Sequence, residues 1–96
     1  MSEQTVTVPR PDQRDDLGSS SGDSIVIVFD NSVNTYDQVI DILQKATGCS
    51  LAEAEMETWE IDKLGRSVVH HGDRPECERA AAIIATIGIE VKVETL

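Results

Sequence analysis

A short apolar run that leads into a polar corner and then into a helical pattern is the feature that most constrains this chain. Ile25–Phe29 are five consecutive apolar residues, mostly β-branched, which is typical of a buried strand. The polar segment 30–34 follows and predicts a loop. Apolar residues then recur at helical spacing: Tyr36, Val39, Ile40 and Leu43. We therefore expect a corner that places a carboxylate and amides beside the buried ends of a strand and a helix.

Two possible N-caps compete for the start of this first helix. Thr35 with Gln38 has the spacing of a capping box, and Asn34 with Asp37 is the alternative. The helix is expected to end near Thr47, because a glycine follows and suits a left-handed C-terminal position.

A second helix is expected from a cap at Ser50 to about Leu64, closed by Gly65. One of its faces carries Leu51, Ala54, Thr58 and Ile61, whereas Met56 and Trp59 lie on another side. Its acidic residues, which we interpret mostly as a solvated face, are Glu53, Glu55, Glu57, Glu60 and Asp62.

The remaining chain predicts strand 67–71, a helix capped by Asp73 with Pro75 in its first turn, and the alternating strand Ile89–Val93. The third helix is expected to end at Gly88. The order β-α-α-β-α-β on one core predicts a single small α+β domain, with a three-stranded antiparallel sheet and three helices on one face.

Composition separates a tail from this domain and limits the partners. Residues 1–23 are rich in Pro, Gly, Ser and Asp, which predicts a disordered N-terminal extension before a domain at 24–96. The net charge of −10 disfavours nucleic acid and anionic membrane and favours cationic peptides and amino termini. No apolar run approaches the roughly 20 residues that a membrane-spanning helix needs.

The residue types that carry metal, redox or hydrolytic chemistry are few. Cys49 and Cys77 form no CxxC motif and no secretory signal is visible, so we expect free thiols in a reducing cytoplasm. His70 and His71 are adjacent on a predicted strand and point to opposite faces, so they cannot chelate one metal together. We therefore expect no metal, no cofactor and no enzymatic activity.

The first helix also carries a family resemblance. Residues 38–45 read Gln-Val-Ile-Asp-Ile-Leu-Gln-Lys, which closely resembles the first helix of the ClpS family, adaptors that hand N-end-rule substrates to a Clp AAA+ protease. The resemblance covers about residues 24–96 and implies the same β-α-α-β-α-β fold. It further implies a cytoplasmic adaptor that binds protein N-termini (N-degrons) and the N-terminal domain of a Clp AAA+ ATPase.

The resemblance assigns candidate ligand-binding residues by position. The family's Asn-Asp-Asp corner falls on Asp30-Asn31-Ser32, its gating Met on Tyr36, and its His at the end of helix two on Asp62. The full set that the resemblance implies is Asp30, Asn31, Ser32, Asn34, Tyr36, Val39, Thr58, Ile61 and Asp62. Such a site would favour cations and a smaller or more polar first residue than Leu or Phe.

The resemblance also assigns a docking surface for the Clp ATPase at the start of helix three. Glu78 stands where the family commonly has Glu, and Arg79 lies beside the position of a family Lys. A third-strand residue that closes the family's ligand pocket falls somewhere from Ile89 to Val91.

Two alternatives stay open at this point. Asp30 and Asn31 can form only a turn before the helix, with Asp62 on the surface and Tyr36 in the core. The second alternative follows from the changes at the family's Asn, Met and His positions: the chain is then a ClpS-fold interaction module that has lost N-degron recognition and binds another partner through the acidic face of helix two.

Overall fold

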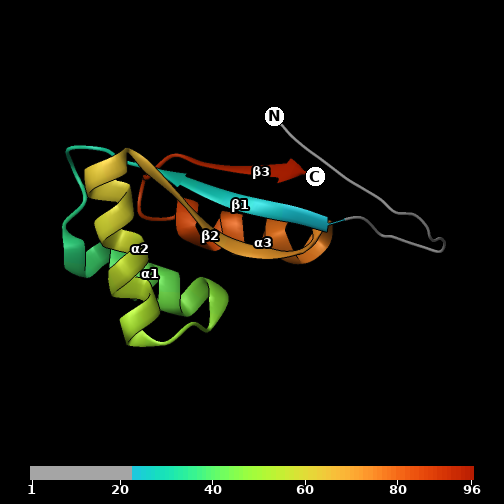
Figure 1. The fold of residues 1–96 in the computed structure, drawn as a ribbon, viewed down its shortest axis with the longest axis horizontal. Helices are drawn as coiled ribbons and strands as arrows, with labels where there is room; N and C mark the ends of the chain where they lie inside the picture. The colour runs from blue at the N-terminus through green and yellow to red at the C-terminus, as the bar shows by residue number, and fades with distance from the viewer. Residues whose placement is uncertain (1–22) are drawn as a thin grey trace, which may run out of the picture.

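The computed structural model describes residues 23–96, which form six elements in the predicted order β-α-α-β-α-β (Figure 1). These are β1 (Asp23–Phe29), α1 (Tyr36–Thr47), α2 (Leu51–Leu64), β2 (Arg66–Asp73), α3 (Arg74–Ala85) and β3 (Val91–Thr95). The predicted α+β class is thereby confirmed, and the tail expected at the N-terminus lies outside the described residues apart from Asp23.

The three strands form one antiparallel sheet in the order β2-β1-β3, so the first strand of the chain lies in the middle. Asp23 pairs with Asp73 and Phe29 with Arg66 at the two ends of the β1–β2 ladder. The register shifts between Val26 and Ile27, whose partners are His70 and Val68, so β2 has one extra residue at Val69. The side chain of Val69 lies in the core at this bulge, where it is 5% exposed.

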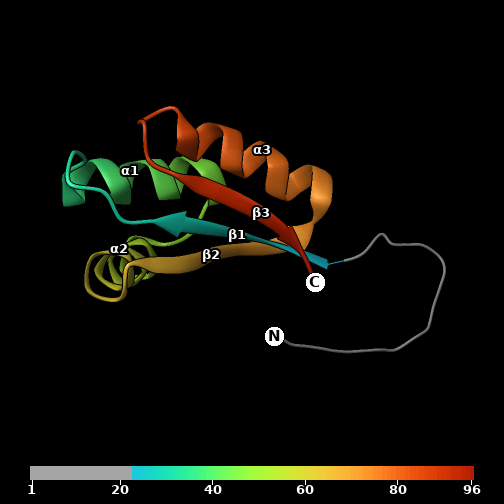
Figure 2. The same cartoon turned by 90° about the horizontal axis from the view of Figure 1, so that it is seen from above.

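The helices pack on one side of the sheet, as the sequence predicted (Figures 1 and 2). α3 runs along all three strands, whereas α2 lies against β2 and α1, near the end of the sheet where β1 ends. Between them lies an almost entirely aliphatic core. Its fully buried members include Val26, Val28, Leu43, Ala54, Cys77 and Ile84.

Each helix begins at a side-chain cap that the sequence indicated. Thr35 caps α1 and forms a reciprocal capping box with Gln38, so the alternative cap at Asn34 is wrong. Ser50 accepts the backbone N–H of Glu53 to cap α2, and Asp73 caps α3 in the same way. These caps satisfy N–H groups that the first turn of a helix leaves without partners.

Four sequence-based expectations require correction. α3 ends at Ala85 rather than Gly88, because Thr86 and Ile87 close a tight turn onto Ile83 and Ile84. β3 begins at Val91, and Ile89 lies in the connection before it. β2 extends one residue earlier and two later than expected. Leu51, predicted on the inward face of α2, is 53% exposed at the first position of the helix.

The described part of the chain contains no helix that is both long enough and apolar enough to cross a membrane. Cys49 and Cys77 are both free thiols, as expected.

Candidate functional site: a pocket at the corner

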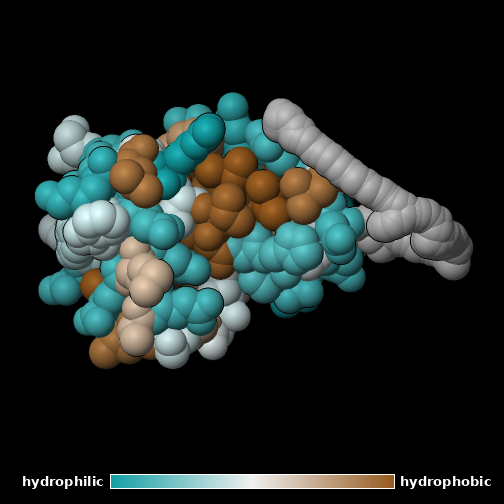
Figure 3. Space-filling view, in the orientation of Figure 1, coloured by the Kyte–Doolittle hydropathy of each residue, from teal (hydrophilic) through white to brown (hydrophobic). Residues whose placement is uncertain are grey.

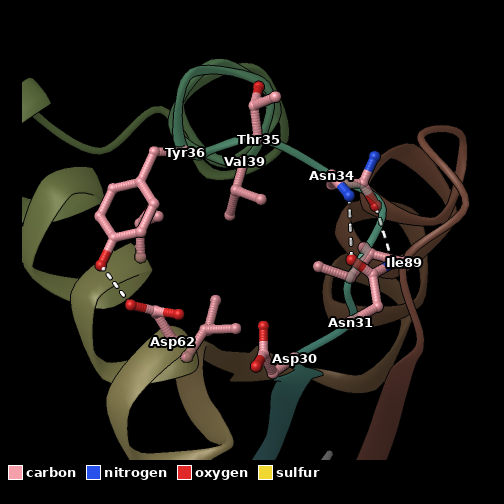
Figure 4. A pocket seen from close by; sticks show the side chains of 10 residues that line it. Asp30, Asn31, Asn34, Thr35, Tyr36, Val39, Asp62 and Ile89 are labelled. Carbon is pink, nitrogen blue, oxygen red and sulfur yellow. Dashed lines mark hydrogen bonds between the residues drawn. The ribbon is translucent and has the colours of Figure 1, made fainter.

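A small pocket lies where the end of β1, the start of α1 and the end of α2 meet (Figure 4). Its volume is about 60 Å³, which is room for a few water molecules or for a short side chain. The lining residues are Asp30, Asn31, Asn34, Thr35, Tyr36, Val39, Thr58, Ile61, Asp62 and Ile89.

Two backbone hydrogen bonds, one to the segment before β3 and one to the end of α2, fix the position of Asp30. The N–H of Phe29 donates to the carbonyl of Glu90 at 3.0 Å, and the N–H of Asp30 donates to the carbonyl of Gly65 at 2.9 Å. Gly65 ends α2 with a positive φ of 91°, a backbone conformation that side chains other than glycine rarely adopt. The end of one helix therefore positions the carboxylate at the end of the central strand.

Asn31 and Asn34 use their amide groups to hold the loop in shape. Asn31 Oδ1 accepts the backbone N–H groups of Val33 and Asn34, and Asn31 Nδ2 donates to Asn34 Oδ1 at 2.8 Å. Asn34 Nδ2 in turn donates to the carbonyl of Ile87 at 2.9 Å and ties the loop to the end of α3. Because both lone pairs of Asn31 Oδ1 are engaged, this residue supports the pocket, and the acceptor free for a ligand is the carboxylate of Asp30.

Tyr36 and Asp62 join the two helices across the mouth of the pocket. The Tyr36 hydroxyl donates to Asp62 Oδ2 at 3.0 Å (Figure 4). Desolvation of the phenol raises its pKa, and the hydrogen bond and the negative charges of Asp62 and Asp30 raise the pKa further. Asp30 and Asp62 both line the pocket, and two carboxylates at one site favour a cationic ligand.

Part of the pocket lining is apolar. Val39, Ile61 and Ile89 are each at most 5% exposed and contribute aliphatic side chains. The Thr58 hydroxyl donates to the carbonyl of Ala54 at 2.7 Å, so its hydrogen-bonding need is met within α2. Figure 4 shows Asp30 and Asp62 on one side of the pocket and Val39 on the other. The pocket therefore combines two carboxylates with aliphatic side chains, which suits an ammonium group attached to a short apolar group.

The structure brings together eight of the nine residues that the resemblance assigned to ligand binding. The exception is Ser32, which is exposed in the loop outside the pocket. The resemblance placed a pocket-closing residue somewhere from Ile89 to Val91, and the structure has Ile89 in the lining. Thr35 also lines the pocket, although the sequence indicated it only as a helix cap. Ile89 could be suspected only from the resemblance, which left the position open over three residues. Ligand binding by these residues stays a prediction.

The other candidates lie away from this pocket. Glu78 and Arg79 are exposed on α3, where Arg74 Nε donates to Glu78 Oε2 at 2.9 Å. His70 is half-buried, with Nε2 2.9 Å from Glu76 Oε2, whereas His71 is exposed. Among residues 23–96, no group of three or more His, Cys, Asp or Glu side chains is placed to hold a metal ion.

The family is decided by a comparison with known protein families. Residues 22–90, more than two thirds of the chain, match the model of the family described as ATP-dependent Clp protease adaptor protein ClpS. The chain belongs to the ClpS family. This is a family of non-catalytic adaptors, which agrees with the absence of catalytic motifs noted in the sequence.

Curated relatives of this ClpS-family chain include much longer proteins. The E3 ubiquitin-protein ligase UBR2 of Homo sapiens is 41% identical over 58 residues, and UBR1 of Homo sapiens is 43% identical over 54 residues. These segments make up 60% and 56% of this chain but only 3% of each ligase. The similarity therefore concerns one small region of the ligases.

A solved structure has the same fold. Agrobacterium tumefaciens ClpS2, solved in complex with L-phenylalaninamide, matches with a TM-score of 0.75 over 80% of this chain and 100% of that chain. At 14% sequence identity, this likeness shows the fold alone.

Proposed function

We propose that this ClpS-family domain binds free protein N-termini in the corner pocket and acts as a cytoplasmic adaptor for a Clp AAA+ ATPase. The observation that carries the proposal is the pairing of the carboxylates of Asp30 and Asp62 with the buried aliphatic wall that includes Val39. An N-terminal residue presents the complementary groups, an α-ammonium and an adjacent side chain. The L-phenylalaninamide bound to Agrobacterium tumefaciens ClpS2 is an amino-acid amide, and this ligand of a protein with the same fold agrees with the proposal.

Charge and pocket size define the ligand that we expect. An ammonium ion hydrogen-bonded to a carboxylate contributes about 1.5–3 kcal/mol, and acetylation removes both the charge and the donors. The volume of about 60 Å³ suits Ala, Val or another short first residue better than Phe or Trp. We therefore expect the adaptor to select free N-termini with small side chains.

Fluorescence anisotropy with labelled peptides tests this function. The peptides differ only in the first residue, and each is made with a free and an acetylated amino terminus. We expect binding of some free peptides and loss of binding after acetylation. Asp30→Asn and Asp62→Asn should each weaken binding by about 10-fold or more, because each removes a charge-assisted hydrogen bond.

Asp41→Asn is the matched control, because Asp41 is exposed on α1, pairs with Lys45 at 2.9 Å and does not line the pocket. If no free peptide binds, or if acetylated peptides bind equally well, the pocket does not recognise N-termini and the proposal is wrong.

Delivery to the Clp ATPase rests on the family description and on the exposed pair Glu78 and Arg79. This surface belongs to the first half of α3, which begins at the end of the sheet remote from the corner where β1 ends (Figure 1). An adaptor with this arrangement can hold a peptide at one end and the ATPase at the other. Glu78→Lys should abolish binding of an isolated Clp ATPase N-terminal domain and leave peptide anisotropy unchanged, whereas Asp41→Lys should change neither. Retained ATPase binding by Glu78→Lys would exclude this docking surface.

A further inference from the structure

One side of α2 presents apolar residues to solvent. Successive residues on a helix differ by about 100°, so Ala52, Met56 and Trp59 share a face. We call these three residues the outer α2 stripe. Their face is opposite the one that buries Ala54 and Ile61 against the core. Met56 is 64% exposed and Trp59 is 51% exposed, so neither is needed to close the core.

The stripe is visible on the face of the molecule that carries α2. In Figure 3, pale and brown side chains run along the position of α2 in Figure 1, between teal ones. Trp and Met are enriched in the buried centres of protein interfaces, where Trp is among the residues whose truncation costs the most binding energy. The chain has one Trp, and the fold leaves it half uncovered on the outside of a helix.

Carboxylates border the stripe on both sides. Glu53, Glu57 and Glu60 follow one another at intervals of four and three residues along one border, and Glu55 lies on the other. Like charges at these spacings repel one another. Burial raises the pKa of Glu57 to about 7, and the charges of Glu53 and Glu60 add smaller contributions. This repulsion is relieved when a cation is brought beside the row.

Ser67 Oγ donates to Glu60 Oε1 at 2.6 Å. Lys63, one turn after Trp59 on the same face, pairs with Asp62 at 3.5 Å, so the carboxylates outnumber this base.

The charges decide which kind of partner fits. An anionic membrane would be repelled by this border, and a second copy of the chain would bring the same row of carboxylates. We propose that the outer α2 stripe is a docking site for a basic amphipathic helix of another protein, with its apolar face on Met56 and Trp59 and its Lys or Arg side chains against the acidic border. This proposal does not depend on peptide binding in the corner pocket.

The stripe and the corner pocket lie on different sides of α2 and come close to each other at Asp62. The pocket uses Thr58, Ile61 and Asp62, which lie on the inner side and the C-terminal end of α2. The stripe lies on the outer side. Asp62 follows Trp59 by three residues on α2, so a helix bound to the stripe would pass beside the mouth of the pocket.

Trp59 provides the signal for a test, because the emission of the only Trp in the chain shifts when its ring is buried. The probe is an 18-residue peptide of Leu and Lys with Leu at helical i, i+3, i+4 and i+7 positions. We expect a blue shift of Trp59 emission, saturable binding, and an affinity that falls as salt is raised. A Leu/Glu peptide with the same apolar pattern and a scrambled Leu/Lys peptide without an apolar face should give no shift.

Two variants test whether the Leu/Lys peptide binds at the outer α2 stripe or non-specifically elsewhere on the surface. Met56→Ala should weaken binding of the Leu/Lys peptide by about 5- to 10-fold, as expected for an interface anchor. Val68→Ala is the matched control, because Val68 is an apolar residue that is 51% exposed on β2, outside the stripe. The Val68→Ala variant should bind the Leu/Lys peptide with the affinity of the unchanged protein. Both substitutions are at exposed positions and should leave the fold intact.

Three outcomes would overturn the proposal. The first is equal binding of the Leu/Lys peptide to the unchanged protein and to Met56→Ala, or an equal shift with the Leu/Glu peptide. The second is a shift that depends on protein concentration without any peptide, which would make a second copy the occupant. The third is a shift with phosphatidylglycerol-containing vesicles, which would make the stripe a membrane contact.

Discussion

Tyr36 closes the corner pocket from its open side and is itself 43% exposed. Its ring occupies space that a larger ligand side chain would need. We predict that Tyr36→Ala shifts the preference toward peptides that begin with Phe or Leu, with a gain of about 10-fold in affinity for them, because the freed volume permits more apolar burial. Peptide anisotropy measures this change.

Tyr36→Phe is the control for that prediction. It keeps the ring and removes only the hydrogen bond to Asp62. The preference for small first residues should therefore persist in Tyr36→Phe. If Tyr36→Ala has the same preference as the unchanged protein, Tyr36 does not limit the size of the ligand.

Glu57 makes the stability of the fold depend on pH. Burial, and then the charges of Glu53 and Glu60, raise its pKa from 4.5 to about 7, and its buried Oε1 has no hydrogen-bond partner. Between these two values the folded chain holds a proton that the unfolded chain has lost. The free energy of unfolding therefore falls as the pH rises from about 4.5 to about 7, and the loss persists above that range.

We predict that Glu57→Gln is more stable than the unchanged protein at pH 8 and depends less on pH between 5 and 8. Because Glu57 is half exposed, the gain should be no more than about 1 kcal/mol, or about 4–8 °C in Tm for a domain of this size. Thermal unfolding followed by circular dichroism measures it. Glu55→Gln, at an exposed position, should retain the pH dependence of Tm seen in the unchanged protein. If Glu57→Gln also retains it, Glu57 is not the group that makes stability depend on pH.

Among the secondary-structure elements, the C-terminus of α2 connects stability to the site. Gly65 has a φ of 91°, and its carbonyl accepts the N–H of Asp30. We predict that Gly65→Ala costs about 1 kcal/mol or more in stability and also weakens N-terminal peptide binding, because relief of the strained φ moves the carbonyl that positions Asp30.

Gly48 offers a matched comparison at the end of α1. It has a φ of 73°, open space at its Cα and no residue of the pocket bonded to it. Gly48→Ala should therefore lower the urea midpoint by a similar amount and leave peptide affinity unchanged. Equal loss of affinity in both variants would show that the effect is only one of stability.

The elements differ in how well they could be predicted from sequence. Helix starts could be predicted because the cap at Thr35, Ser50 or Asp73 is a local interaction with the next turn. The start of β3 could not, because the alternation Ile-Glu-Val-Lys-Val reports burial alone. Ile89 is 4% exposed as a member of the core and lines the pocket, whereas strand pairing begins at Val91.

The same distinction applies to the candidate site. The corner and the end of α2 could be placed together because a family resemblance supplied the long-range contact that spacing lacks. The sequence did not predict that Asn31 holds the loop while Asp30 faces the pocket. These roles depend on which side chain accepts the backbone N–H groups of the loop. The Tyr36–Asp62 hydrogen bond joins residues 26 positions apart, and no local pattern indicates it.

For the molecule as a whole, the burial of Cys77 gives a direct measure of global opening. Its side chain is 0% exposed, and burial raises the pKa of the thiol, which lowers the fraction of reactive thiolate. We predict that Cys77 reacts with a thiol reagent at least about 100-fold more slowly than the partly buried Cys49, because reaction requires an opening that costs several kcal/mol. The variant Cys49→Ser isolates the slow thiol, whose rate should rise with urea. Equal rates for both thiols in native buffer would contradict a single cooperative core.

The position of β1 in the sheet also determines when the domain can form during synthesis. Within residues 23–96, the strand made first is the one that needs a partner on each side, and its second partner, β3, is the last element of the domain. A growing chain that stops before Val91 therefore exposes an unpaired edge of its most apolar strand, which invites aggregation. Because loops spanning most of the domain must close before the sheet exists, folding is expected to follow translation of Thr95 and not to accompany it.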